Sequence, residues 1–182
     1  MMAPGCWGAI ACHSGDVGFE AMFKPTLSET LTHVASFGSA AGYVEHVRQA
    51  AKLSGPDFHS LMICAMAASY DPRQPTTDNP IGIELPVEAR TASIDTEAWN
   101  RWLAFDPLVM IEAQAEGLEN LSGFWLDCGD RDQYHIQYGS RSLTDRLSQL
   151  GIKHHWEEFS GTHSGIDHRL DLSLPFLANA LK

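Results

Sequence analysis

Short apolar runs predict the strands of a parallel sheet. Residues 7–12 form a continuous apolar run, which is typical of a strand buried on both faces. Residues 123–128 form a second such run, and residues 153–159 form a third, less apolar one that suits a place near the edge of the sheet. Because helical patterns separate these runs, the order of elements predicts an α/β fold.

The end of the chain has a regular helical spacing of apolar residues. Residues 136–150 carry leucines on one face and are followed by Gly151, a residue suited to the position after a helix C-terminus. A last helix is predicted from about residue 174 to residue 181, with Ser173 as its N-cap. Three residues share one face of that helix and are expected to point inward: Leu174, Leu177 and Leu181.

A long helical insertion separates the first two predicted strands. Within residues 16–116, helices are predicted at 42–53, 57–69, 96–105 and 108–115, and the proline-rich stretch 71–86 is predicted to be a loop with a short extended piece at 81–85. An insertion of about 100 residues is too long for a simple crossover between strands. We therefore expect a lid-like insertion within one domain that spans residues 1–182. Its large side chains either line a pocket or pack against one another.

The length and composition are those of a globular protein with an acidic surface. The chain has 182 residues, and its hydrophobic content of 44% is enough for one packed domain. Twelve basic residues stand against 23 acidic ones, for a net charge of −11. This charge argues against binding to nucleic acid or to an anionic membrane surface, and it is also explained by solubility alone.

The cysteines and the apolar segments indicate a cytoplasmic protein. Four cysteines lie scattered with no Cys-x-x-Cys pair, which is typical of free thiols in a reducing compartment. No run approaches the ~20 apolar residues of a membrane span. The first residues do not resemble a secretory signal either, because no basic residue precedes the apolar run and Pro4 and Gly5 interrupt it.

Candidate chemistry follows the second and third predicted strands. Asp127, Asp130 and Asp132 lie across the end of the second strand, and His163 lies in a Gly-rich loop just after the third. In α/β-hydrolases a catalytic acid and a histidine follow two strands in this order, after the nucleophile. A carboxylate fixes the tautomer of such a histidine and stabilises its charge. We therefore expect an acid–histidine pair at this edge of the sheet.

These residues resemble the closing third of the esterase-D-like family of serine hydrolases, which includes S-formylglutathione hydrolases, enterochelin esterases and feruloyl esterases. The family's strand-Gly-x-x-Asp motif matches Gly129 and Asp132, and its Gly-x-His-Ser motif matches Gly161, His163 and Ser164. Residues 7–16 look like the strand that follows the nucleophile helix. The resemblance covers the whole chain, but it is weak between residues 18 and 115.

The resemblance implies an incomplete α/β-hydrolase fold made of its last three strands. It also implies a carboxylic-ester hydrolase that uses a Ser-His-Asp triad on a small-molecule ester, with no cofactor. His163 would be the general base. Asp132 matches the position of the family's acid, whereas Asp130 next to Gly129 more often caps its own turn. We expect Asp132 to face Nδ1 of His163, with Asp130 as the alternative acid.

One departure from the family concerns the nucleophile, which we do not find in this sequence. The family places its serine in Gly-x-Ser-x-Gly, and the chain contains no such pentapeptide. Ser14 lacks the glycine two places before it, and Ser164 comes one place too late. We therefore expect the chain to begin inside the helix after the nucleophile, with residues 1–3 as its tail, and to be inactive alone. The strand at 7–12 would then lack a partner, and its edge could cause self-association.

Other interpretations of the same residues remain open. The chain could be an inactive remnant or a binding module with this fold. His13 could line a pocket or form structural hydrogen bonds. A metal-dependent hydrolase is a weaker alternative, because adjacent histidines on a strand face opposite sides and a spacing of five does not suit a helical ligand pair. That alternative would use His154, His155, His163, Asp167 and His168, and we expect no metal site.

Overall fold

The structure of the chain is a computed structural model that describes residues 5–182, so the helix tail expected at residues 1–3 lies outside the described part. The chain divides into two compact units. The sheet unit comprises the residues up to Met22 together with Asp106–Lys182, and the helical unit comprises Phe23–Phe105. The helical unit is thus a shorter stretch of the chain than the insertion expected at residues 16–116. Helices and a parallel sheet together confirm the predicted α/β class.

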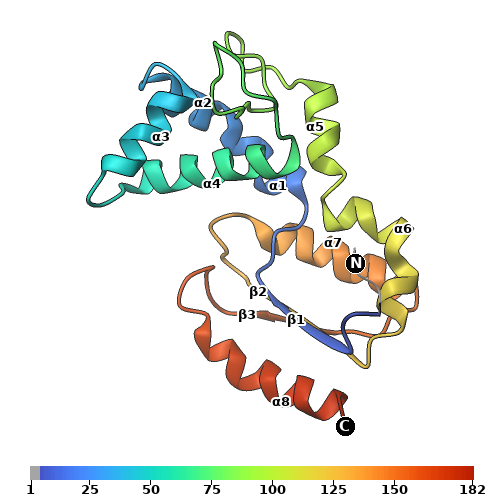
Figure 1. Ribbon diagram of the computed structural model, residues 1–182. Helices are drawn as coiled ribbons and strands as arrows, with labels where there is room; N and C mark the ends of the chain where they lie inside the picture. Colours follow the sequence, from blue (N-terminus) through green and yellow to red (C-terminus); the bar gives the residue numbers. More distant parts are fainter. Residues whose placement is uncertain (1–4) are drawn as a thin grey trace. The chain divides into compact units, whose positions relative to one another are not determined.

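The sheet unit contains three parallel strands in the order β1-β2-β3 (Figure 1). They are β1 (Ala9–His13), β2 (Gly123–Gly129) and β3 (His155–Phe159). Every residue of β2 is buried, as its position between two strands requires, whereas β1 and β3 are half-buried. The β1 strand was expected to be buried on both faces, and its free edge explains why it is not.

Helices cover both faces of this sheet. α7 (Ile136–Gln149) packs against β2 on one face, and α8 (Leu170–Ala180) packs against β1 and β2 on the other (Figure 1). α1 (Phe19–Met22) and α6 (Pro107–Glu119) pack on α7. Asp106 joins these two helices, because its carboxylate accepts hydrogen bonds from the backbone N–H groups of Gly18, Phe19 and Leu108 at 2.7–3.0 Å.

The predicted terminal helix was wrong in its start and in its inward face. A single 3₁₀ turn, Asp167–Arg169, leads directly into α8, so the helix begins about one turn earlier than expected. Ser173 is therefore not an N-cap but a fully buried residue inside the helix. Leu174 and Leu181 are 57% and 61% exposed and Leu177 is half-buried, because the face that carries Ser173 turns toward the sheet.

Smaller differences concern the ends of other elements. α6 runs through Gly117 to Glu119, whereas the helix was predicted to end at residue 115. The extended piece expected at residues 81–85 does not form a strand, and the loop there contains only an isolated antiparallel bridge between Val87 and Ile94. No helix in residues 5–182 is long and apolar enough to cross a membrane.

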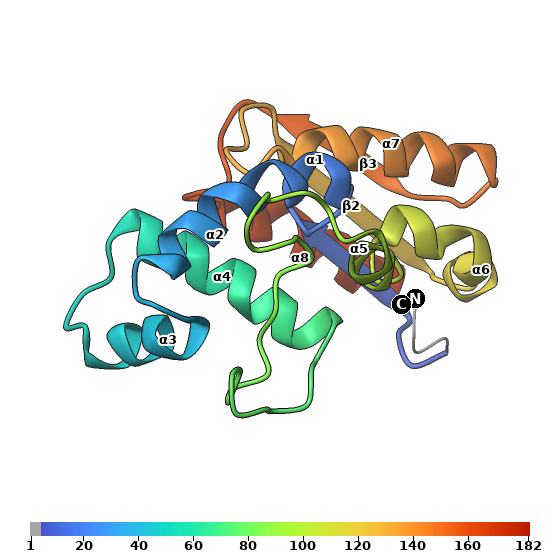
Figure 2. The same cartoon turned by 90° about the horizontal axis from the view of Figure 1, so that it is seen from above.

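The helical unit is built from the 3₁₀ turn η1 (Lys24–Thr26) and four α-helices. These are α2 (Leu27–Ala35), α3 (Ala40–Gln49), α4 (Gly55–Tyr70) and α5 (Thr96–Leu103). α2, α3 and α4 pack on one another, and α2 lies alongside α4 (Figure 2). Asp95 caps α5, since its carboxylate accepts hydrogen bonds from the first turn of that helix.

Asp57 joins three helices of the helical unit. It closes a capping box with Ser54 at the start of α4, and its Oδ1 accepts from Nε2 of His33 on α2 at 3.1 Å and of His46 on α3 at 3.2 Å. The hydroxyl of Tyr43 donates to its backbone carbonyl. Hydrogen bonds from Ser54 and from His33 hold the pKa of Asp57 well below its ordinary value.

Candidate active site

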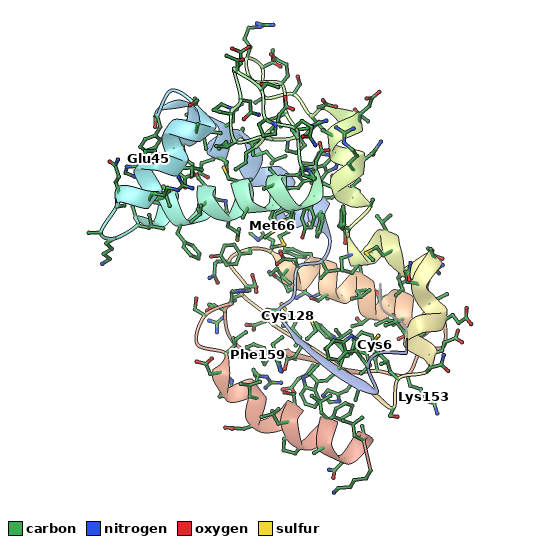
Figure 3. All side chains as sticks on the ribbon, viewed as in Figure 1. Cys6, Glu45, Met66, Cys128, Lys153 and Phe159 are labelled. Atoms are coloured by element: carbon green, nitrogen blue, oxygen red, sulfur yellow. The ribbon has the colours of Figure 1, made fainter. Side chains whose placement is uncertain are left out.

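Asp132 is held rigidly in the loop that follows β2. Its side chain is fully buried, and its Oδ1 accepts a hydrogen bond from the backbone N–H of Tyr134 at 2.8 Å. The side chain of Asp132 thus closes its own turn, which fixes the direction of the carboxylate. The other oxygen, Oδ2, faces the loop that follows β3. The thiol of Cys128, which Figure 3 labels in β2, lies 3.8 Å from the same Oδ2.

His163 meets this carboxylate from the loop after β3. Its Nδ1 lies 3.0 Å from Oδ2 of Asp132, so the contact expected from the sequence is present. The ring of Tyr134 packs edge-on against the imidazole at a centroid distance of 5.0 Å, which restricts its rotation. The side chain of His163 is 34% exposed, and its Nε2 has no hydrogen-bond partner within residues 5–182. An imidazole oriented by a carboxylate and open at Nε2 can accept a proton from a bound molecule.

The two loops touch at their glycines, where β2 and β3 end. A Cβ on Gly129 would lie 2.7 Å from the carbonyl oxygen of Gly161, so only glycine permits this approach. Asp130 does not face His163; its Oδ1 accepts from the N–H of Gly161 at 2.9 Å. That hydrogen bond also lowers the pKa of Asp130 from its ordinary value. Asp130 therefore joins the loops, and Asp132 is the carboxylate that contacts the imidazole.

Asp16 is a third ionisable group near the pair, and sequence reasoning did not single it out. Burial raises its pKa; a positive charge on His163 lowers the pKa in part, and the charge of Asp132 raises it further. A largely apolar cavity of about 160 Å³ lies against Asp16. The only sequence signal for Asp16 was its position four residues after the first predicted strand.

A second Ser-His-Asp chain lies in the sheet unit, but its serine cannot reach a substrate. Nδ1 of His13 lies 2.8 Å from Asp127, and Nε2 lies 2.9 Å from the hydroxyl of Ser173. Ser173 is fully buried in α8. Asp127 also accepts hydrogen bonds from Arg169 at 2.9 Å and from the indole of Trp125 at 2.8 Å. Both nitrogens of His13 are thus engaged, which favours the structural alternative over the pocket-lining one.

Neither serine considered as a nucleophile contacts His163. Ser14 is buried with a left-handed φ of 47°, and its hydroxyl faces the thiol of Cys128 at 3.6 Å. The hydroxyl of Ser164 accepts a hydrogen bond from Gln133 at 3.3 Å. In residues 5–182, no serine hydroxyl is within hydrogen-bonding distance of Nε2 of His163.

The histidines of the metal alternative do not converge. Nδ1 of His154 contacts the carbonyl of Ile152, and His155 stacks on Trp125 at 3.9 Å. His168 contacts the carbonyl of Gly165. Within the part of the chain that the structure describes, no three His, Cys, Asp or Glu side chains are grouped so that they could hold a metal ion.

Comparison with known proteins adds no assignment to this geometry. No protein-family model matches the chain, and no curated protein matches it.

Proposed function

We propose that the chain supplies the acid and the base of a Ser-His-Asp hydrolase acting on carboxylic esters, of the esterase-D-like kind. One observation carries the proposal: the buried carboxylate of Asp132 contacts Nδ1 of a partly exposed His163, whose Nε2 is left open. Both residues follow adjacent parallel strands, at the strand ends where α/β folds bind ligands.

The charges around Asp132 support this assignment over the pair formed by His13. Asp127 already forms an ion pair with the guanidinium of Arg169, whereas no Lys or Arg in residues 5–182 forms an ion pair with Asp132. The charge of Asp132 is therefore free to stabilise an imidazolium at His163.

In the proposed reaction, a serine outside this chain approaches Nε2 of His163. The imidazole takes the hydroxyl proton while the serine oxygen attacks the ester carbonyl, and Asp132 stabilises the resulting imidazolium. Nε2–H then gives that proton to the leaving alcohol. A water molecule repeats the sequence in the second half and releases the acid and the serine.

The open edge of β1 offers a place for the strand that would carry this serine. On the other edge of β1, the carbonyl of Gly8 and the N–H of Ser14 form hydrogen bonds with the β2 side of the sheet. The even-numbered residues of this segment therefore direct their backbone N–H and C=O groups toward β2. Ala9, Ala11 and His13 direct their backbone groups to the free edge, where no strand of residues 5–182 pairs with them. A parallel strand added there would end beside the strand ends that precede Asp132 and His163.

The test is to co-express the chain with the polypeptide encoded directly upstream of the Met1 codon, where we expect an in-frame Gly-x-Ser-x-Gly. The pair should hydrolyse a short-chain nitrophenyl ester and react with a fluorophosphonate at the upstream serine. Asp132→Asn should lower the rate by about 10⁴-fold, as expected when a triad histidine loses its acid.

Asp130→Asn is the matched control, because it alters a neighbouring carboxylate that contacts only the other loop and its neighbour Arg131. Its rate should stay near that of the unchanged chain. Hydrolysis that persists undiminished in His163→Ala would contradict the proposed function. A larger loss in Asp130→Asn than in Asp132→Asn would contradict the assignment of the acid.

A further inference from the structure

The side-chain amide of Gln133 forms hydrogen bonds with His163 and with the residue that follows it. Its Oε1 accepts a hydrogen bond from the backbone N–H of His163 at 3.1 Å, and its Nε2 donates to the hydroxyl of Ser164 at 3.3 Å. Gln133 directly follows Asp132 in the chain. One loop therefore provides both the carboxylate that contacts the imidazole and the amide that holds the backbone beneath it.

The other hydrogen bonds between the loop after β2 and the loop after β3 involve residues that precede His163. The N–H of Arg131 donates to the carbonyl of Gly161 at 2.9 Å, and its guanidinium contacts the hydroxyl of Ser160 at 3.1 Å. Gln133 is thus the residue that ties down the peptide of His163 itself. The side chain of His163 can meet Asp132 only if that peptide keeps its position, because the imidazole pivots about its own Cα.

We infer that Gln133 is a positioning residue that fixes the backbone of His163 and so keeps the proton of the imidazole on Nδ1, facing Asp132. The inference concerns the same site and rests on the proposed function for its catalytic meaning. Without the amide of Gln133, the loop would move, the contact with Asp132 would open, and the neutral imidazole would exchange between its two tautomers. Because Gln133 is exposed, its replacement leaves the core intact.

The test is nuclear magnetic resonance of the full chain at neutral pH, which requires no ester hydrolysis. In the unchanged protein we expect a slowly exchanging Nδ1 proton on His163 and ring nitrogen shifts of a single tautomer. In Gln133→Ala and in Gln133→Met, the proton signal should be lost and the nitrogen shifts should move toward a mixture. The backbone amide of His163 should exchange roughly two- to tenfold faster.

Two further variants separate positioning from general damage to the loop. Gln133→Glu keeps the acceptor for the N–H of His163 and should restore the Nδ1 signal. Ser164→Ala removes only the other contact of Gln133 and should leave the signal unchanged. An unaltered Nδ1 signal in folded Gln133→Ala and Gln133→Met would overturn the inference, whatever the outcome of the ester assay. Loss of the signal in Ser164→Ala as well would show that the loop, and not Gln133, positions the histidine.

Discussion

Two Asp–His pairs occur in the sheet unit, and they differ in which hydrogen-bonding atoms their surroundings leave open. Asp127 is surrounded by donors, and its partner His13 has both ring nitrogens occupied. Asp132 has one oxygen committed to its own turn and the other directed at His163, which keeps one nitrogen open. The two pairs thus differ in whether a ring nitrogen of the histidine remains without a hydrogen-bond partner in residues 5–182, and a general base requires such a nitrogen.

At this scale the sequence predicted the contact between Asp132 and His163 but not the neighbours that hold it. The contact follows from strand order, because adjacent parallel strands end at the same edge of a sheet. Tyr134 and Gln133 contact His163 because of the directions their side chains take in a loop, and no periodic pattern in the sequence predicts those directions. Asp16 comes near the pair only through the path of the chain after β1.

Asp16 should make the stability of the sheet unit depend on pH. Its pKa in the fold is raised above the ordinary 3.8, so the folded state holds this proton more tightly than the unfolded state does. Stability from this group is therefore complete below about pH 3.8 and decreases as the pH rises through the raised pKa. We expect Asp16→Asn to raise the Tm at pH 7 by a few degrees, and the difference should shrink near pH 3.

Thermal melts of both proteins across this range provide the measurement. Asp145→Asn is a suitable control, since it changes the net charge by the same amount on the surface-facing side of α7. A Tm lowered by Asp16→Asn at neutral pH would show that the charged carboxylate stabilises the fold, against this account.

Among the elements, α8 anchors the far end of the loop that carries His163. Arg169, in the 3₁₀ turn that leads into that helix, is buried and donates from Nε to Asp127 at 2.9 Å, while its Nη2 contacts Glu157 of β3 at 2.6 Å. Ser173, one turn further on, reaches His13. The loop is therefore fixed at its start by contacts with the loop after β2 and at its end by a buried ion pair.

Removal of this guanidinium should be costly, because it leaves the fully buried charge of Asp127 without its main partner. We expect Arg169→Leu to destabilise the sheet unit by about 3–5 kcal/mol in chemical denaturation. Arg146→Leu breaks an exposed pair with Glu112 and should change the stability little. Comparable losses in the two variants would contradict a special role for the buried pair.

The same helix illustrates where element prediction fails. Leucines at residues 174, 177 and 181 have helical spacing, and the period was correct although the inward face was not. The buried positions include Ser173, which folds inward because it finds a hydrogen-bond partner in His13. A polar residue paired across 160 positions of sequence cannot be recognised from local hydrophobicity. Strands β2 and β3, whose signals are local, were predicted nearly to their ends.

For the molecule as a whole, the open edge of β1 is the main consequence of the sheet order. Three residues there direct backbone groups outward from a half-buried strand, and no strand of residues 5–182 pairs with them, which makes the edge a template for pairing. We propose that the isolated chain self-associates through this edge. A further strand supplied by another polypeptide would compete for the same groups.

Ala11→Pro tests this edge, because it removes an N–H that points away from β2 and should leave the β1–β2 pairing intact. We expect the unchanged chain to form larger species in light scattering as its concentration rises, and Ala11→Pro to reduce them strongly. Ala11→Ser keeps the N–H and should associate as before. A monodisperse monomer that unfolds cooperatively, without any substitution, would refute self-association.

We propose that Asp132 and His163 are the acid and the base of an ester hydrolase whose nucleophile does not come from residues 5–182. The most direct test is hydrolysis of a short-chain nitrophenyl ester by the purified chain alone, beside its His163→Ala variant and free imidazole. We expect a rate no greater than that of imidazole at equal concentration, because the serine would come from elsewhere, and so would the oxyanion donors, of which each is worth about 3 kcal/mol or more. Turnover far above imidazole that His163→Ala abolishes would contradict this claim and would locate a nucleophile within these 182 residues.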